Sequence, residues 1–302
     1  MLIRHLLLKQ LYSMFPFSLK GDCPVSPERD DIIISCVINF YGRLDLLEGI
    51  LHSLAQQEYP AEQFEVVLVE DKGGTEAGRA LIETFKSRLN IVYVPLDKQF
   101  GRMGYSRNFG VLHSRGKIVL FLDDDTVILQ KDFLEKLENV FTKHLEIDAV
   151  IPHGMASFSL VEDRYNFHDP YFMTSRCTAY QRRALTDLSG FMNHFVGQED
   201  VEFVIRFHMA GKLAIQVPEL EYYHPPLLVP NFSKPQAVGN SFYGLKSRYP
   251  FVFWLLAILN CARHAPLYLL PVKRYREMGR FGLGFMAGVV VSIFKKNGFK
   301  YS

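Results

Sequence analysis

The sequence predicts an α/β fold in which an open, mostly parallel sheet is flanked by helices and followed by an apolar helical tail. Between residues 32 and 122, short apolar runs alternate with segments of helical spacing. Uninterrupted apolar runs are typical of strands that are buried on both faces, and this alternation is the pattern of parallel strands joined by right-handed crossovers. Two long uncharged stretches after residue 249 indicate the tail.

The individual elements are predicted from the spacing of their apolar residues. In the first helical segment, for example, Ile50, Leu51 and Leu54 lie on one face. We expect strands at residues 32–38, 64–69, 91–94, 117–122, 149–152, 214–217 and 220–223. We expect helices at residues 44–57, 75–89, 106–114, 131–144, 184–188 and 200–210, and a loop-rich stretch that ends at Arg176.

The chain divides into three expected regions. Residues 1–20 contain an amphipathic helix that ends near Phe15-Pro16, and residues 17–30 have the glycine and prolines of a linker. The core of a secretory signal needs about 7–15 apolar residues. Because Lys9 interrupts the first apolar run, we expect an amphipathic helix here and not a secretory signal. Residues 31–235 form the α/β domain, and residues 236–302 form a basic, apolar helical tail that we expect to associate with a membrane.

Composition and charge restrict the possible partners. The 302 residues are 48% hydrophobic, which is enough for a sizeable core, and the net charge of +2 gives no reason to expect a nucleic acid partner. The tail is basic, since Glu277 is the only acid after residue 243. Basic ends with apolar runs favour an anionic membrane surface, and the alternative is two solvated basic faces. The four scattered cysteines indicate neither zinc nor a disulfide framework, which fits a reducing, cytosolic location.

The two uncharged runs of the tail lie within residues 249–262 and 281–294. Each has about 14 residues, which is fewer than the roughly 20 that a spanning helix needs. We therefore expect two helices that lie on the membrane or re-enter it, so that the protein is peripheral or monotopic on the cytoplasmic side. The alternative is a pair of core helices packed on the domain.

Three adjacent carboxylates, Asp123, Asp124 and Asp125, directly follow the predicted strand 117–122. Ligands of open α/β sheets bind beyond the carboxyl ends of the strands. Carboxylates this close repel one another unless a cation neutralises them, and Mg²⁺ or Mn²⁺ on a diphosphate would do so. The alternative is a solvated acidic turn before the following helix.

Five segments, taken in order over about residues 31 to 225, resemble the family 2 inverting glycosyltransferases, which have a GT-A fold. They are residues 35–43 (Pro-Thr-Tyr-Asn in the family), 67–73 (Val-Asp-Asp-Gly-Ser), 101–110 (Gly-x-x-x-Ala-Arg-Asn-x-Gly), the acidic triplet, and 197–203 (Gly-x-Glu-Asp). Arg206, Gly211 and His224 match later family positions. Asn39-Phe40 replaces the usual Pro-Thr, and residues 70–73 also depart from the pattern, so the resemblance specifies the family better than the nucleotide.

The resemblance implies a role for each matched residue. Asn39 and Tyr41 would line the base pocket, and Glu70 and Asp71 would accept hydrogen bonds from the uracil or ribose. The alternative for the two acids is a turn before Gly73-Gly74. The remaining nucleotide-sugar positions are Arg102 and Arg107 facing the diphosphate, Asp123 near the ribose or its neighbouring groups, and Asp124, to which the resemblance gives no more specific contact. The metal positions are Asp125 and, as a further ligand, His224. Arg107 and His224 would otherwise be packing residues.

Asp200 is the expected general base. An inverting transfer needs a carboxylate that removes the acceptor proton while a metal stabilises the leaving diphosphate. Glu199-Asp200 precedes a predicted helix, whose N-terminus favours negative charge. Glu199 is the second catalytic candidate, either as the base itself or in positioning the acceptor. The alternative is that these acids merely cap the helix.

The sequence therefore predicts a transferase that moves one sugar from a nucleotide-diphosphate sugar, most commonly a UDP-sugar, to a lipid-linked, polysaccharide or other cell-envelope acceptor. The Gln-x-x-Arg-Trp motif of processive synthases is absent, and the single tryptophan, Trp254, lies in the tail. One alternative is a nucleotidyltransferase acting on sugar phosphates, although Tyr41-Gly42-Arg43 is a poor version of its loop. A second is a non-catalytic nucleotide-sugar-binding membrane scaffold, against which the two acidic motifs argue.

Overall fold

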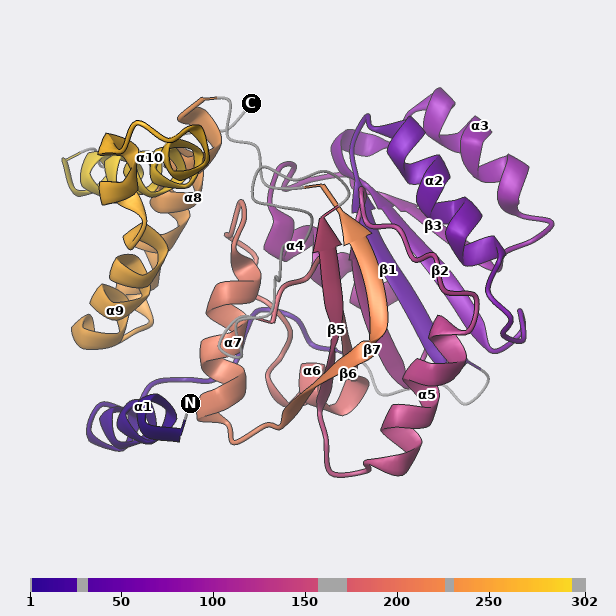
Figure 1. Ribbon diagram of the computed structural model, residues 1–302, viewed down its shortest axis with the longest axis horizontal. Coiled ribbons are helices and arrows are strands. Elements are labelled where there is room, and N and C mark those ends of the chain that lie inside the picture. Colours follow the sequence, from indigo (N-terminus) through magenta and orange to yellow (C-terminus); the bar gives the residue numbers. More distant parts are fainter. Residues whose placement is uncertain (1, 26–31, 157–172, 226–230, 295–302) are drawn as a thin grey trace.

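The computed structural model describes residues 2–25, 32–156, 173–225 and 231–294 (Figure 1). Part of the expected linker (26–31), most of the expected loop-rich stretch (157–172) and the basic residues Lys295, Lys296 and Lys300 lie outside these ranges.

One seven-stranded sheet organises the described chain. Its strands are β1 (Ile34–Phe40), β2 (Phe64–Glu70), β3 (Ile91–Pro95), β4 (Ile118–Asp123), β5 (Ala149–Ala156), β6 (Cys177–Gln181) and β7 (Ala214–His224). Their order is β3-β2-β1-β4-β6-β5-β7, and within it β6 runs antiparallel to both of its neighbours while the other pairs are parallel. The predicted open, mostly parallel α/β sheet is confirmed.

Helices cover both faces of the sheet. The helices of the described chain are α1 (Leu2–Met14), α2 (Leu44–Ala55), α3 (Glu76–Phe85), α4 (Met103–His113), α5 (Phe133–Lys143), α6 (Arg182–Asp187), α7 (Glu199–Met209), α8 (Ser233–Tyr243), α9 (Phe251–Ala262) and α10 (Lys273–Phe294), and those that cover the sheet are α2 to α7. Ile34, Cys36 and Ile38 of β1 belong to a core with α2, α3 and α5. Val37 belongs to a second core with α4, α6 and α7, as the alternation of side chains along a strand requires.

Two predictions about the later strands were incomplete. Strand β6 was not predicted, because its five residues mix polar and apolar types and its burial comes from lying between β4 and β5. The two short strands expected at 214–217 and 220–223 are one strand, β7. Its pairing with β5 shifts register between Pro152 and His153, which leaves residues 218–220 of β7 outside the ladder.

The predicted apolar helices of the tail are present, and α8 joins them. Helices α8 and α10 pack closely at glycines: a Cβ on Gly288 would lie 2.1 Å from the carbonyl oxygen of Gln236, and one on Gly239 would lie 2.0 Å from that of Phe285. A third apolar core joins α8, α9 and α10 to residues Met192 and Phe195, which precede α7. The proposed division of the chain at residue 235 therefore falls within α8, and it stays a prediction.

The N-terminal segment packs on the same group of helices. The Phe17 ring centroid lies 4.9 Å from that of Phe253 and 4.3 Å from that of Tyr249. Within the expected linker, Cys23 and Val25 are buried in the second core. The N-terminal region is thus attached to the rest of the protein through Phe17 and through Cys23 and Val25.

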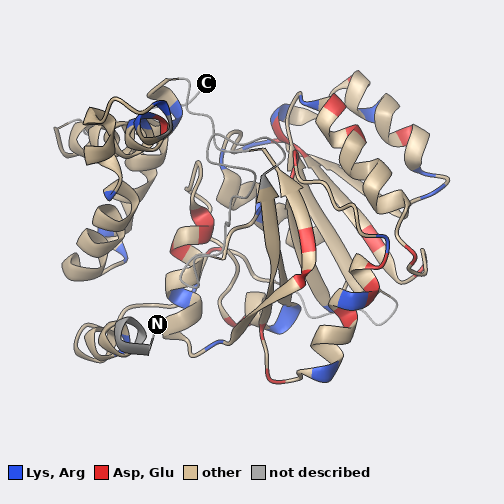
Figure 2. Cartoon of the chain, viewed as in Figure 1, with Lys and Arg blue, Asp and Glu red and all other residues tan. Residues whose placement is uncertain are grey.

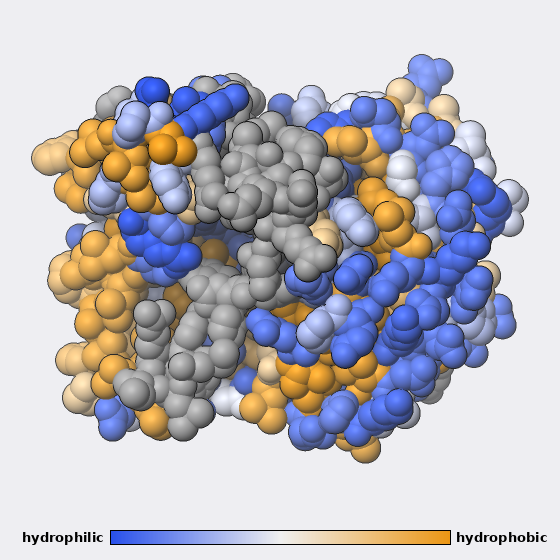
Figure 3. All heavy atoms as spheres, viewed as in Figure 1, coloured by the Kyte–Doolittle hydropathy of each residue, from blue (hydrophilic) through white to orange (hydrophobic). Residues whose placement is uncertain are grey.

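Two stretches of the tail, Phe251–Leu269 and Tyr275–Phe294, are long and apolar enough to cross a membrane by length and composition. The helical stretches are longer than the uncharged runs of about 14 residues, because η3 (Ala265–Leu269) extends the first and α10 begins at Lys273. Only 28% and 39% of these stretches are buried. Figure 2 shows few charged residues on α1 and α9 and a cluster of charged residues at one end of α10, and Figure 3 shows hydrophobic side chains over the tail helices.

Candidate active site

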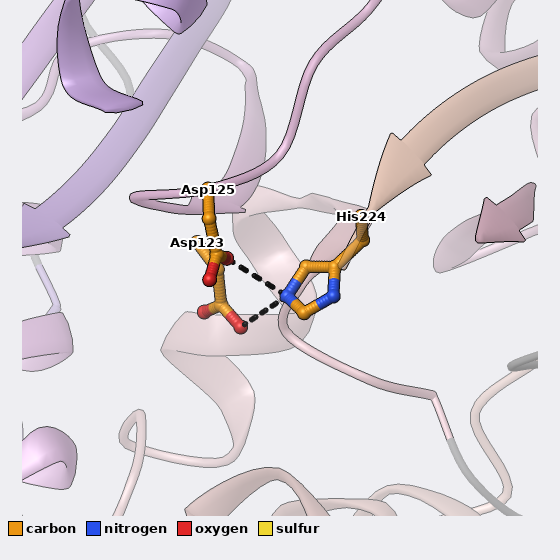
Figure 4. Close-up of side chains that lie close together, drawn as sticks. All are labelled: Asp123, Asp125 and His224. Carbon is orange, nitrogen blue, oxygen red and sulfur yellow. Dashed lines mark ion pairs between the residues drawn. The ribbon is translucent and has the colours of Figure 1, made fainter. Parts of the chain in front are cut away.

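The candidate site lies at the carboxyl ends of β1, β4 and β7. Asn39 of β1 is the register partner of Asp123 of β4, so the two strands end side by side. His224 is the last residue of β7 and faces Asp123 and Asp125 (Figure 4). The acidic triplet begins where β4 ends because the apolar run that makes the strand ends at Leu122.

Asp123, Asp125 and His224 form a group that fits a divalent cation. One ligand atom from each residue lies within 4.8 Å of the others. The Nε2 atom of His224 lies 2.8 Å from Oδ1 of Asp125 and 3.6 Å from Oδ2 of Asp123 (Figure 4). The Nδ1 atom lies 2.5 Å from the carbonyl oxygen of Pro225, which can only accept, so Nδ1 carries a proton and Nε2 is directed at the carboxylates. Two carboxylates and one imidazole are suitable ligands for a metal such as Mn²⁺.

The electrostatics of this group hold two carboxylates ionised. Burial acts to raise the pKa of Asp123, but the hydrogen bond from His224 and the charge of Arg107 outweigh it and lower that pKa. The pKa of Asp125 is lowered against burial in the same way by His224 and Arg43. For His224, burial acts to lower the pKa, and the two carboxylates raise it above its usual value.

Asp124 pairs with Arg43 and not with His224 or Arg107. Arg43 was not predicted as a site residue. The guanidinium of Arg43 donates to Asp124 from Nε at 3.2 Å and from a second nitrogen, and its Nη1 lies 2.8 Å from Oδ2 of Asp125. Burial raises the pKa of Asp124 to about 6, and Arg43 offsets part of that effect. Arg43 was identifiable in principle, because it lies at the carboxyl end of β1.

The two predicted diphosphate arginines have different surroundings. Arg107 on α4 is buried, and it pairs with Glu199 through Nε at 2.6 Å and with Asp123 through Nη2 at 2.7 Å. Arg102 immediately precedes α4, is exposed, and donates to the side chain of Gln99 at 3.3 Å. Of these two arginines, only Arg107 contacts a carboxylate of the acidic triplet.

Glu199 and Asp200 begin helix α7 and are held in different ways. Glu199 is buried, and burial raises its pKa to about 7 while Arg107 acts in the opposite direction. Asp200 accepts hydrogen bonds from the backbone N–H of Ser175 at 3.0 Å and of Val201 at 2.8 Å. Glu199 is thus part of a buried ion pair, and the carboxylate of Asp200 is fixed by backbone groups instead.

Asn39 and Tyr41 lie at and beyond the end of β1. The Asn39 side-chain amide donates to the hydroxyl of Ser106, and its Oδ1 is buried without a hydrogen-bond partner among the described residues. Tyr41 is half exposed, and the ammonium of Lys72 lies 4.7 Å from its ring centroid. Ser106 and Lys72 were not predicted as site residues, because their positions follow from the packing of α4 and from the turn after β2.

Glu70 and Asp71 accept hydrogen bonds that hold the neighbouring loops in place. Glu70 is buried and accepts from the hydroxyls of Thr75, at 2.8 Å, and Tyr93. Asp71 accepts from the backbone N–H of Gly101 at 2.7 Å and of Lys72 at 2.8 Å. Their predicted contact with the nucleotide stays a prediction. The described geometry shows that Asp71 fixes the loop leading to Arg102.

The sheet and its acidic edge define the class of protein, a GT-A type glycosyltransferase fold. The first 349 residues of TarS from Staphylococcus aureus superpose with a TM-score of 0.59 at 19% identity, over 83% of this chain and 71% of that one. The mannosyltransferase PcManGT from Pyrobaculum calidifontis superposes with a TM-score of 0.61 at 16% identity, over 97% of both chains. At these identities the likeness establishes the fold.

The family follows from the sequence itself. The profile described as Glycosyl transferase family 2 matches residues 35–197, more than half of the chain. The chain belongs to this family. The predicted resemblance and GT-A fold are confirmed, and the predicted enzyme class is confirmed at the level of the family.

The curated relatives match over shorter segments. The poly(ribitol-phosphate) beta-N-acetylglucosaminyltransferase TarS of Staphylococcus aureus is 27% identical over 113 residues, which are 37% of this chain and 20% of the relative. The poly(ribitol-phosphate) beta-glucosyltransferase of Bacillus spizizenii is 32% identical over 96 residues, which are 32% of this chain and 15% of the relative. The match thus spans a fifth or less of each of these relatives.

The raised pKa of Glu199 predicts a pH-dependent effect of Glu199→Gln. A carboxyl group whose pKa rises on folding contributes stability that is complete below its unfolded pKa and is lost as the pH rises through its folded pKa. From about pH 4.5 to about pH 7, the wild type should therefore lose up to about 3 kcal/mol of unfolding free energy relative to the variant. Urea unfolding at several pH values measures this difference, with Glu62→Gln on the exposed surface as control. A difference that stays constant with pH would contradict the assignment.

Proposed function

We propose that the chain is an inverting glycosyltransferase that moves one sugar from a nucleotide-diphosphate sugar to a hydroxyl of a cell-envelope acceptor. The observation that carries the proposal is the position of a three-ligand cation site beside the Arg107–Glu199 pair, with Asp200 next to that pair on α7. Membership in family 2 favours this function over a nucleotidyltransferase or a non-catalytic scaffold.

The proposed donor site uses the cation ligands and the basic residues around them. Asp123, Asp125 and His224 would hold Mg²⁺ or Mn²⁺, which when bound supplies charge stabilisation to the leaving diphosphate. The mannosyltransferase of similar fold was solved with GDP-Man and Mn²⁺, and TarS with UDP-GlcNAc, which supports a nucleotide-sugar donor. Tyr41 offers an exposed ring on which a base can stack. UDP is the nucleotide that we propose, on the family resemblance and the TarS complex.

Asp200 is the proposed general base. Its carboxylate would take the proton from the acceptor hydroxyl while that oxygen bonds to the anomeric carbon and the bond from this carbon to the diphosphate oxygen breaks. Because attack and departure occur on opposite faces, one displacement inverts the configuration. Glu199 would act as a positioning residue, because its ion pair with Arg107 links the start of α7 to Asp123. The backbone N–H groups of Ser175 and Val201 would hold the Asp200 carboxylate in a fixed orientation.

The acceptor that we propose is a cell-envelope glycan or lipid-linked glycan, reached from the cytoplasmic side of a membrane. The names of two relatives specify poly(ribitol-phosphate) as acceptor. The proposed membrane surface consists of the exposed apolar side chains on α1, η3, α9 and α10, which include Leu6, Leu7, Phe251, Leu256, Leu259 and Leu269. Arg263 and Lys273 lie on the same tail and suit anionic head groups.

Asp125→Ala tests the metal site. In wild type, UDP or GDP should raise the melting temperature by several degrees more with Mn²⁺ than without it, because a ligand near 100 times its dissociation constant adds about 2.7 kcal/mol. The variant should lose this metal-dependent increment, and Asp132→Ala, at an exposed residue just before α5, should keep it. Retention of the full increment by Asp125→Ala would show that the metal is held elsewhere.

Asp200→Asn tests the general base. The turnover number should fall by about 10²- to 10⁴-fold while Mn²⁺-dependent UDP binding is retained, since the amide cannot take the acceptor proton. The measurement is transfer of radiolabelled sugar to glycan acceptors that support wild-type turnover. Asp187→Asn, on the surface of α6, serves as control. Turnover of Asp200→Asn at the wild-type rate would exclude Asp200 as the base.

Glutamate substitutions on α9 test the membrane surface. The full chain should co-sediment with anionic phospholipid vesicles, and Leu256→Glu/Leu259→Glu should reduce the bound fraction at least about tenfold, since each buried leucine contributes about 1.5–3 kcal/mol. The matched control is Leu145→Glu/Leu213→Glu, two leucines of the α/β domain that are 71% and 51% exposed. Equal loss of binding in both double variants would indicate a general charge effect and contradict the proposal.

A further inference from the structure

Arg43 makes contacts that no other basic residue of the site makes. It lies between β1 and α2, and its guanidinium reaches both Asp124 and Asp125 across the carboxyl edge of the sheet. Its Nη1 lies 2.8 Å from Oδ2 of Asp125, while the other oxygen of that carboxylate lies 2.8 Å from Nε2 of His224. Both oxygens of Asp125 are therefore engaged by basic groups of the chain itself.

The three basic groups at the triplet differ in how firmly they are held. The Arg107 side chain is 3% exposed and is shared between Asp123 and Glu199, and the His224 side chain is 8% exposed and also bonds the Pro225 carbonyl. The Arg43 side chain is 49% exposed, and among the described residues it forms ion pairs with Asp124 and Asp125. The Asp124 and Asp125 side chains are 12% and 10% exposed, so only the Arg43 side of these pairs is open to solvent. A half-exposed guanidinium recovers its hydration when it leaves a carboxylate, whereas removing a partner that is itself buried is costly. Arg43 is thus the group that can leave the triplet at least cost.

Resting on the proposed function, we propose that Arg43 is a displaceable counter-cation of the metal site. In the free enzyme it neutralises Asp124 and Asp125. A divalent ion that binds Asp125 competes with it for the same carboxylate and repels it. Arg43 then loses Asp125 as a partner and keeps Asp124. A diphosphate would offer it a new anion, since a planar guanidinium is well suited to pair with phosphate oxygens.

This role couples the two ligands. A metal ion alone must compete with Arg43 for Asp125, whereas a metal ion that arrives with a nucleoside diphosphate also brings a new partner for the displaced guanidinium. Arg43 should therefore weaken metal binding to the free enzyme and increase the gain in metal affinity that the nucleotide provides. It is a positioning residue in this scheme, since it does not contact the reacting atoms.

The test is a titration of the full chain with Mn²⁺, in which the electron paramagnetic resonance signal of free Mn²⁺ reports binding without any turnover. Free Arg43→Gln should bind Mn²⁺ about 2- to 10-fold more tightly than wild type, as expected when competition from a half-exposed guanidinium is lost. The factor by which UDP or GDP increases Mn²⁺ affinity should be smaller in Arg43→Gln than in wild type. Arg43→Lys, which keeps the charge and loses the planar fork, should give intermediate values and serves as a second variant if Arg43→Gln does not fold.

Arg88→Gln is the matched control, because it removes the same charge from a residue that lies over the Phe85 ring at the end of α3. It should leave Mn²⁺ affinity unchanged. If the free Arg43 variants bind Mn²⁺ no more tightly than wild type and the nucleotide gain is intact, the Arg43 inference is wrong while the proposed function stands. If no form of the protein binds Mn²⁺ even with UDP or GDP, the proposed metal site is wrong and the Arg43 inference falls with it.

Discussion

The ion pairs of Arg107 are the interaction on which the candidate site depends. This one buried guanidinium joins Asp123, at the end of β4, to Glu199, at the start of α7. Burial of the charged Arg107 and Glu199 side chains is costly unless each has a partner in good geometry. These ion pairs therefore fix the position of α7 relative to the sheet. Asp200 follows Glu199 on the same helical turn. The proposed base is thereby held at a set place beside the proposed cation ligands.

The same face of α7 is fixed further along the helix by a second buried network. Glu202 pairs with Arg206 at 2.6 Å and accepts from the hydroxyl of Tyr249 at 2.6 Å. Arg206 in turn donates to the backbone carbonyls of Leu188 at 2.9 Å and Gly190 at 3.0 Å. Tyr249 lies just before α9, so the helix that carries the proposed base also supports the start of the apolar tail. If the tail attaches to a membrane, the hydrogen bond from Tyr249 to Glu202 connects that attachment to α7, the helix that carries the proposed base.

The three carboxylates of the acidic triplet have different sets of basic partners. Asp123 has Arg107 and His224, Asp124 has Arg43, and Asp125 has His224 and Arg43. The surrounding basic groups balance the repulsion that three adjacent charges create. In the proposed scheme, a cation would bind to this site by exchange with one of its basic groups, and Arg43 is the most exposed of the three named here.

The sequence by itself determined the strands β1 to β4, the acidic triplet, the Glu-Asp pair and the family. These features depend on residues that are close in the sequence. An uninterrupted apolar run predicts a buried strand, and carboxylates that follow such a run lie at the edge of a parallel sheet where ligands bind. Only the tertiary structure decided that Arg107 pairs with Glu199, that Arg43 reaches the triplet, and that Glu70 supports a loop. It also decided β6, which is a strand because β4 and β5 supply its hydrogen bonds. Periodicity records which face of an element is buried, but the partner of a charged side chain depends on how elements distant in sequence pack together.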